Sequence, residues 1–181
     1  MSPKRENRLI IEIPRINISE PSDILKIAQH VKNNQNREIL IVITGSGNIT
    51  DEIASLAYES SHNQIGSPEL DELLALGQLL DAQLITTSLK SQKIKATYID
   101  PFQDNPISTI GNSGNPQISE IKTIHDVKRL IDSKLSNNII ILCGLIGRNE
   151  NGKITIIREN PANILRILKK ALNTRLHLSM H

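Results

Sequence analysis

Aromatic residues are nearly absent from this sequence, which contains one Phe, two Tyr and no Trp among 181 residues. Proteins that bind single-stranded nucleic acid stack the bases on aromatic side chains, so this composition argues against nucleic acid as a partner. The hydrophobic core must instead be built from aliphatic side chains. A chain of this length can bury such a core as a single domain.

Cysteine is equally scarce, and no disulfide framework can form. Cys143 is the one cysteine, and the apolar run NNIIILCG around it predicts a buried strand residue rather than a nucleophile. The five histidines lack the spacing of metal ligands, so no metal site is expected. They are His30, His62, His125, His177 and His181.

Long hydrophobic runs are also missing. No apolar segment approaches the roughly 20 residues of a membrane span, so no membrane association is expected. The first residues, MSPKRENR, lack the apolar core of a signal peptide, which favours a cytoplasmic protein. Residues 1–7 are expected to form a disordered arm. The net charge of +2 is spread along the chain, and the basic groups near each end are interpreted as solvated faces.

What the sequence does contain is an alternation of strand-type and helix-type segments. This order predicts an α/β protein, a three-layer αβα sandwich with a mainly parallel sheet. Residues 8–173 are expected to form one domain, and residues 174–181 a C-terminal tail too short for another element. The predicted strands are 8–13, 38–44, 94–100, 137–147 and 153–159, and the predicted helices are 19–34, 49–60, 68–91, 121–135 and 162–173.

The turn TGSGN, residues 44–48, joins a buried strand to a helix. Its backbone N–H groups at Gly45 to Gly47 could bind a carboxylate or phosphate, or the segment could be merely a tight connection. Asn48 or Thr50 is expected to cap the helix that follows. Because the full GxGxxG spacing is absent, both interpretations of the turn stay open.

Polar residues also occur on the long apolar helix predicted over 68–91. Gln78 could line a pocket or reach the surface at the edge of the helix, and a buried amide would need partners. The acidic group Glu69, Asp71 and Glu72 is interpreted as a solvated face. Asp100 and Gln103 follow a strand end and are interpreted as ordinary turn residues.

Five stretches of the sequence, in a fixed order, follow a known pattern: ILIVITGSGNITDEI (39–53), ELDELLALGQLLDAQLITTSL (69–89), QKIKATYID (92–100), SGNPQI (113–118) and IIILCGLIGRNENGKITIIRENPANILRILKKAL (139–172). Together they resemble the catalytic domain of aspartokinases, which are members of the amino acid kinase family. The resemblance runs over residues 8–173 and implies the N-terminal lobe of a carbamate kinase-like fold, without the nucleotide-binding lobe and the ACT domains of the family.

Two departures from the family pattern concern phosphate and carboxylate binding. The KxGGTS segment of the family, whose Lys neutralises phosphate, aligns with a segment containing Glu12, Pro14 and Arg15, so an acid replaces the base. In the GRGGSD segment, the Arg that clamps a substrate carboxylate becomes Glu159 and the Asp becomes Asn163. The resemblance therefore implies that phosphate and carboxylate binding are lost, and ATP and magnesium are not expected as cofactors.

Part of a substrate pocket is retained. The family's binding residues align with Thr44, Gly45, Thr50 and Gln78, where Gln78 replaces a Glu that binds the substrate's amino group. An uncharged amide holds an ammonium less strongly than a carboxylate does. An amino acid is therefore a possible ligand at a degenerate site.

The expected function is that of an aspartokinase-like pseudoenzyme without kinase activity of its own, which acts as a binding, regulatory or assembly protein through a partner or a homodimer. The predicted support is an exposed apolar flank on the terminal helix, at Ile164, Leu165, Ile167, Leu168 and Leu172. One alternative is the aspartate-binding half of a phosphotransferase completed by another subunit. Another is a structural subunit whose pocket is filled by Arg15 or Glu12. Glu12, Arg15 and Glu159 could also form either a substitute site or an ion-pair plug.

Overall fold

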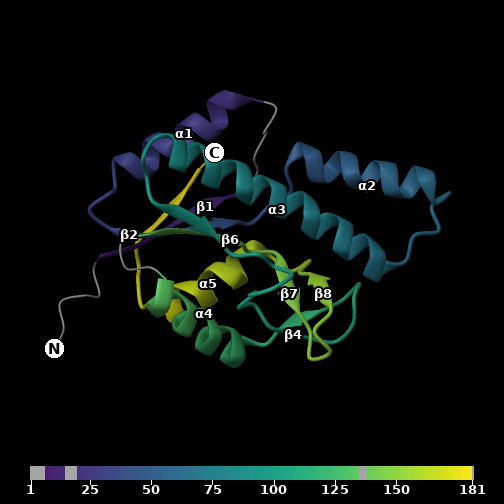
Figure 1. Ribbon diagram of the computed structural model, residues 1–181. Coiled ribbons are helices and arrows are strands. Elements are labelled where there is room, and N and C mark those ends of the chain that lie inside the picture. Colours follow the sequence, from purple (N-terminus) through teal and green to yellow (C-terminus); the bar gives the residue numbers. More distant parts are fainter. Residues whose placement is uncertain (1–6, 15–19, 135–137, 181) are drawn as a thin grey trace.

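The computed structural model describes residues 7–14, 20–134 and 138–180. Its centre is a parallel five-stranded sheet in the order β3-β6-β2-β1-β9. Helices cover both faces of this sheet, which confirms the predicted αβα sandwich (Figure 1). The strands are β1 (Arg8–Ile13), β2 (Glu38–Ile43), β3 (Ala96–Tyr98), β6 (Ile139–Cys143) and β9 (His177–Ser179), and the helices are α1 (Pro21–Lys32), α2 (Asn48–Ser60), α3 (Ser67–Ser91), α4 (Glu120–Lys134) and α5 (Pro161–Leu172).

The central strands are apolar along their whole length because both of their faces are buried. Successive side chains of a strand point to opposite faces, so each strand contributes to two cores. Ile11, Ile41 and Ile141 pack on the side of α1 and α3. Ile10 and Ile140 pack on the opposite side, under α4 and α5. In Figure 1, α1 and α3 lie above the sheet and α4 and α5 below it, while α2 lies alongside α3.

The apolar segment predicted as one strand over 137–147 is divided at Gly144. Strand β6 ends at Cys143, and β7 (Ile146–Arg148) pairs with β8 (Ile154–Ile156) in a separate antiparallel sheet. A Cβ at Gly144 would lie 2.6 Å from Val42 Cγ1 and 3.0 Å from the Ile43 carbonyl oxygen. Glycine therefore allows the chain to leave the central sheet at this point. A second small sheet pairs β4 (Thr109–Ile110) with β5 (Gln117–Ile118).

The C-terminal segment forms a strand. The prediction that it is a tail too short for another element is therefore wrong. Strand β9 pairs in parallel with β1 and forms one edge of the central sheet. The Thr174 side chain donates to the Arg8 carbonyl at 2.6 Å, and the Met180 amide donates to the Glu12 carbonyl at 3.0 Å. The strand is held by these long-range bonds to the first strand rather than by its own length.

The apolar flank predicted on the terminal helix is also absent. Ile164, Leu165, Ile167, Leu168 and Leu172 are all buried in the core beneath the sheet. Large apolar side chains are exposed instead on α2 and α3, at Leu56, Tyr58, Leu76 and Leu80. Among the described residues, no helix combines the length and the apolar character that a membrane span requires.

Candidate functional site

Glu12 and Thr44 meet at the carboxyl ends of the neighbouring parallel strands β1 and β2. The Thr44 hydroxyl donates to Glu12 Oε1 at 2.9 Å, and His177 Nε2 lies 3.0 Å from Glu12 Oε2. Both carboxylate oxygens of this buried residue are thus bound by side chains of the same chain. Arg15, the other residue predicted at the former phosphate position, lies outside the described residues.

The turn after β2 leads directly into α2. The N-cap of this helix is Gly47, which provides no side-chain hydrogen bond, so the predicted caps Asn48 and Thr50 are wrong. Thr50 is turned inward and is buried. Gly45 is partly exposed in the turn, and no described contact tests whether its N–H binds an anion.

Gly77 on α3 is the position that brings Thr50 close to the long helix. A Cβ at Gly77 would lie 2.5 Å from Thr50 Oγ1 and 3.0 Å from Thr50 Cα. Any larger residue would therefore collide with the first turn of α2. This close approach places Thr50 beside the helix face that carries Gln78.

Three buried side chains at this place form what we call the α2–α3 polar cluster: Thr50, Gln78 and Asp81. Thr50 Oγ1, Gln78 Oε1 and both carboxylate oxygens of Asp81 have no hydrogen-bond partner among the described residues. Burial, with a smaller contribution from the charge of Asp51, raises the pKa of Asp81 to about 7. The predicted residues Thr50 and Gln78 are therefore brought together, and Asp81 joins them.

Sequence analysis missed Asp81, although one feature of the sequence points to it. Asp81 follows Gln78 by three residues on a helix, a spacing that places two side chains on the same face. Cys143 closes the cluster from β6, where its Sγ lies 3.5 Å from the Gln78 carbonyl oxygen. Burial raises the pKa of the Cys143 thiol far above its ordinary value, which agrees with the predicted inert cysteine.

The interpretation of Asp71 as a solvated residue is wrong. Asp71 is 0% exposed, and its Oδ1 lies 2.7 Å from Arg158 Nη2. Its Oδ2 accepts a hydrogen bond of 3.2 Å from the Ile156 amide. Asp71 therefore joins α3 to β8 and to the segment before α5.

The turn before α5 satisfies its own polar groups. The Asn160 side chain caps the helix by accepting a hydrogen bond of 2.9 Å from the Ala162 amide. Asn163 Nδ2 donates to Glu159 Oε2 at 2.6 Å. Glu159 is thus engaged locally with Asn163, whereas Glu12 is engaged with Thr44 and His177. Within the described ranges, no three His, Cys, Asp or Glu side chains converge as metal ligands.

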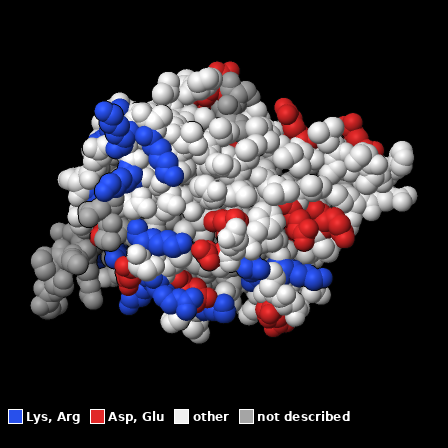
Figure 2. All heavy atoms as spheres, in the orientation of Figure 1, with Lys and Arg blue, Asp and Glu red and all other residues white. Residues whose placement is uncertain are grey.

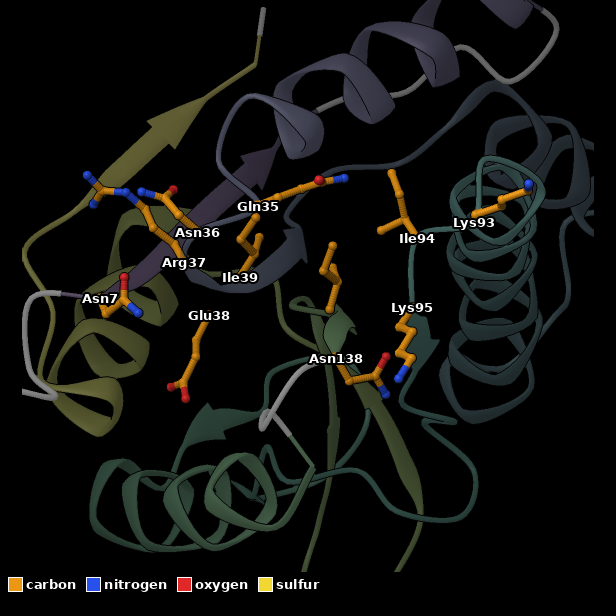
Figure 3. Close-up of a pocket in the computed structure, with 11 residues that line it drawn as sticks. Asn7, Gln35, Asn36, Arg37, Glu38, Ile39, Lys93, Ile94, Lys95 and Asn138 are labelled. Carbon is orange, nitrogen blue, oxygen red and sulfur yellow. The ribbon is translucent and has the colours of Figure 1, made fainter.

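A separate cavity of about 440 Å³ lies at the opposite end of the strands (Figure 3). Its lining includes Asn7, Glu38, Lys95 and Asn138, which lie at or just before the first residues of four parallel strands. Ligand sites of α/β sheets lie outside the carboxyl ends of the strands. The α2–α3 polar cluster lies nearer the carboxyl ends of the strands than the cavity does, because Thr50 follows the carboxyl end of β2.

The sequence profile of the amino acid kinase family matches residues 17–163. Aspartokinase from Geobacillus stearothermophilus is 30% identical to the chain over 135 residues, which are 71% of this chain and 32% of that protein. Aspartokinase 2 from Bacillus subtilis is 30% identical over 131 residues, which are 72% of this chain and 30% of that protein. The chain thus spans about a third of the length of these curated relatives.

Solved structures show the same fold. Aspartokinase III from E. coli, solved with aspartate and ADP, has a TM-score of 0.80 and 14% identity, covering 94% of this chain and 48% of that one. A Giardia carbamate kinase has a TM-score of 0.64 and 12% identity, covering 97% of this chain and 74% of that one. The matching profile, the related sequences and the αβα sandwich agree: the chain belongs to the amino acid kinase family and contains an aspartokinase-like domain.

Proposed function

We propose that this chain is an aspartokinase-like pseudoenzyme, which binds an amino acid-like ligand and does not transfer phosphate by itself. The observation that carries the proposal is the presence of Glu12 and the hydrogen bonds of its carboxylate. A carboxylate stands where aspartokinases are expected to hold a phosphate-neutralising Lys, and Thr44 and His177 bind both of its oxygens. A negative charge at this place repels phosphate instead of stabilising the charge that develops during transfer.

The turn before α5 supports the same proposal. The Asn160 side chain accepts a hydrogen bond from a backbone amide that an anionic ligand would otherwise use, and Pro161 supplies no N–H at all. Glu159, which aligns with the carboxylate-binding Arg of the family, adds a further negative charge. Two positions that would contact anionic groups are therefore acidic in this chain.

Ligand binding is supported by the α2–α3 polar cluster. Buried polar atoms normally have partners, and an unpaired one costs about 1–3 kcal/mol. Thr50 Oγ1 and Gln78 Oε1 lack such partners among the described residues, so a bound polar group would stabilise them. An amino acid is the ligand class that the family's binding residues at these aligned positions favour.

Ligand binding would regulate how the chain associates with a protein partner or with a second copy of itself. The exposed apolar side chains of α2 and α3, with Leu56 66% exposed, are the surface that supports this part of the proposal. They lie on the two helices that hold the polar cluster. A ligand that changes the packing of α2 on α3 would therefore change this surface.

The test compares phosphoryl transfer with binding in the same preparation. We expect no L-aspartate-dependent release of ADP from ATP and magnesium, together with an increase in melting temperature when an amino acid binds. The matched variant Thr50→Val should lose the melting shift and leave the ADP background unchanged. L-aspartate-dependent ADP release that Thr50→Val abolishes would show an active kinase and overturn the proposal.

The alternative is an aspartate-binding half of a phosphotransferase that another subunit completes. The burial of Thr50 and Gln78, which align with the family's substrate-binding residues, favours it. A tagged chain, captured with its native associates, would then release ADP in the presence of L-aspartate. The same capture with Thr50→Val would be inactive, whereas a pseudoenzyme gives equal, background rates in both preparations.

A further inference from the structure

The side chains of the α2–α3 polar cluster carry four buried oxygens that have no hydrogen-bond partner among the described residues. Asp81 contributes two such oxygens and Gln78 contributes Oε1. Thr50 Oγ1 can donate or accept, but it too has no partner among the described residues. The cluster therefore combines one carboxylate with neutral polar groups and contains no positive charge.

Two of these side chains, Gln78 and Asp81, project from the same side of α3. Gly77 and Asp81 are four residues apart, and Gln78 and Asp81 are three apart, so all three lie on one side of the helix. Thr50 packs against that side at Gly77. The unpaired oxygens therefore come from two helices that are in contact at Gly77 and Thr50.

The charged and titratable groups around Asp81 do not compensate it. Asp51 of α2 is an acid, and its charge acts on Asp81 in the unfavourable direction. Cys143 of β6 stays a neutral thiol, because burial and the charge of Asp81 raise its pKa. Asp51 therefore adds negative charge beside Asp81, and Cys143 adds none. A cation bound here would meet no repulsive group among these neighbours.

We propose that Asp81 holds the positively charged group of the ligand, with Gln78 Oε1 and Thr50 Oγ1 as further acceptors. The inference rests on the proposed function and assigns the residue that provides its charge selectivity. Gln78 alone supplies a neutral oxygen, whereas a carboxylate one helical turn away supplies the charge that an ammonium requires. The site is thus specific for cations although Gln78 is uncharged.

The charge distribution of the surface agrees with a cationic group. On the face shown in Figure 2, acidic side chains gather at the side toward which α2 and α3 extend, while Lys and Arg side chains lie at the other side and along the lower part. A local negative potential attracts cations and repels anions. The shared chemistry is a small cation, which is either the ammonium of an amino acid or a free ion such as potassium.

The experiment measures melting temperature of the full chain at pH 8, where Asp81 is mainly ionised. L-aspartate is compared with succinate, which has the same carboxylates and no ammonium, and ammonium and potassium chloride are compared with tetramethylammonium chloride. We expect L-aspartate, but not succinate, to bind, with affinity falling about 10- to 100-fold in Asp81→Asn. The control Glu72→Gln removes an exposed carboxylate from the same helix and should bind normally.

A measurement on the unmodified chain avoids dependence on the variant. The carboxyl carbon of Asp81 is followed by NMR during a pH titration, and a bound cation should lower its titration midpoint. Shifts with ammonium and potassium, but not with L-aspartate, would support the cation site and identify a free ion as its occupant.

Equal binding of L-aspartate by the unmodified chain and Asp81→Asn would overturn the assignment of Asp81, while leaving amino acid binding intact. An unchanged midpoint with all three probes would overturn it as well. The proposed function is tested by a different measurement. L-aspartate-dependent ADP release would refute the pseudoenzyme, whereas the role of Asp81 is decided by the affinity for L-aspartate in the unmodified chain and in Asp81→Asn.

Discussion

Asp71 and Asp81 are two aspartates on the same helix, ten residues apart and equally inaccessible to solvent. Asp71 receives a hydrogen bond from Arg158 and another from a backbone amide of β8. Asp81 receives none from the described residues. The first carboxylate holds the fold together, whereas the second costs stability in the absence of a ligand.

This contrast shows that burial alone does not distinguish a structural acid from a binding acid. What distinguishes them is whether the chain provides its own donors. Groups left unsatisfied by the fold are the places where a natural protein gives up stability, and such places concentrate at functional sites. Four substitutions test how far the two aspartates, and their surroundings, differ.

The largest loss of stability is expected for Asp71→Ala, which leaves the Ile156 amide without its acceptor and Arg158 without its counter-ion. We expect a loss of about 3 kcal/mol, at the lower end of the range for broken buried pairs, because Arg158 is partly exposed and can turn toward water. Urea unfolding measures it. The exposed neighbour Glu72→Gln should change stability by less than about 0.5 kcal/mol, and an equal loss in both variants would contradict the distinction.

Asp81→Asn should act in the opposite direction, and its effect should depend on pH. Because the folded pKa of Asp81 is about 7, against about 3.9 when unfolded, the folded state retains a proton that the unfolded state has released. Stability of the unmodified chain therefore falls as pH rises from about 4 to 7, by at most about 1.4 kcal/mol per pH unit from this group. The Asn variant should lack this contribution.

Urea unfolding of the two proteins at a series of pH values isolates the contribution of Asp81 as a difference. The free energy of unfolding of the variant, relative to that of the unmodified chain, should rise from pH 4 to 7. Above pH 7 the difference should stay constant. Parallel stability curves would mean that Asp81 ionises normally in the folded protein.

Gly77→Ala tests the contact that brings the two helices together. The new methyl group would lie 2.5 Å from Thr50 Oγ1, so α2 must shift, at a cost of about 1–3 kcal/mol. The gain of about 0.5–1 kcal/mol from replacing a helical glycine offsets part of this cost. We expect a net loss of about 1 kcal/mol in urea unfolding, together with weaker ligand binding.

The control for Gly77→Ala is Thr87→Ala, an exposed substitution on the same helix that should be neutral or slightly stabilising. Adding Thr50→Ala to Gly77→Ala should recover part of the loss, because it removes the hydroxyl nearest the new methyl group. Additive losses in the double variant would show that the two residues do not collide.

The smallest effect is expected at Glu120, an exposed acid with more charged partners than either buried aspartate. Hydrogen bonds from Arg166 and Lys170 lower its pKa to about 2. This stabilisation is present above the ordinary pKa of Glu and is lost as pH falls toward 2. Glu120→Gln should therefore change the melting temperature only slightly at pH 7, and not at all in high salt. A loss as large as that of Asp71→Ala would contradict the ranking.

The main layers of the fold could be predicted because they depend on local pattern. The runs RLIIEI and EILIVI contain consecutive apolar residues, and each forms a strand that is buried on both faces. Strand β9 could not be predicted in this way, since HLS is short and only partly apolar. Its bonds join residues more than 160 positions apart, such as Thr174 and Arg8.

The same limit applies to the candidate site. Thr50 and Gln78 were identified through the resemblance to aspartokinases, and the packing of α2 on α3 places both in one cluster. Sequence gave no means to distinguish Asp71 from Asp81, because the partner of Asp71 is Arg158, 87 positions away. Periodicity locates a residue on a helix face, but partners from distant segments decide its chemistry.

The pairing of β9 with β1 affects how the protein folds while it is being synthesised. The first strand of the sheet can pair with β2 early, but its other edge stays open until residues 177–179 have been made. Until then Glu12 also lacks His177. An open edge of this kind can pair with other chains during translation. Chaperone demand and aggregation of the nascent chain should therefore depend on the last few residues described here.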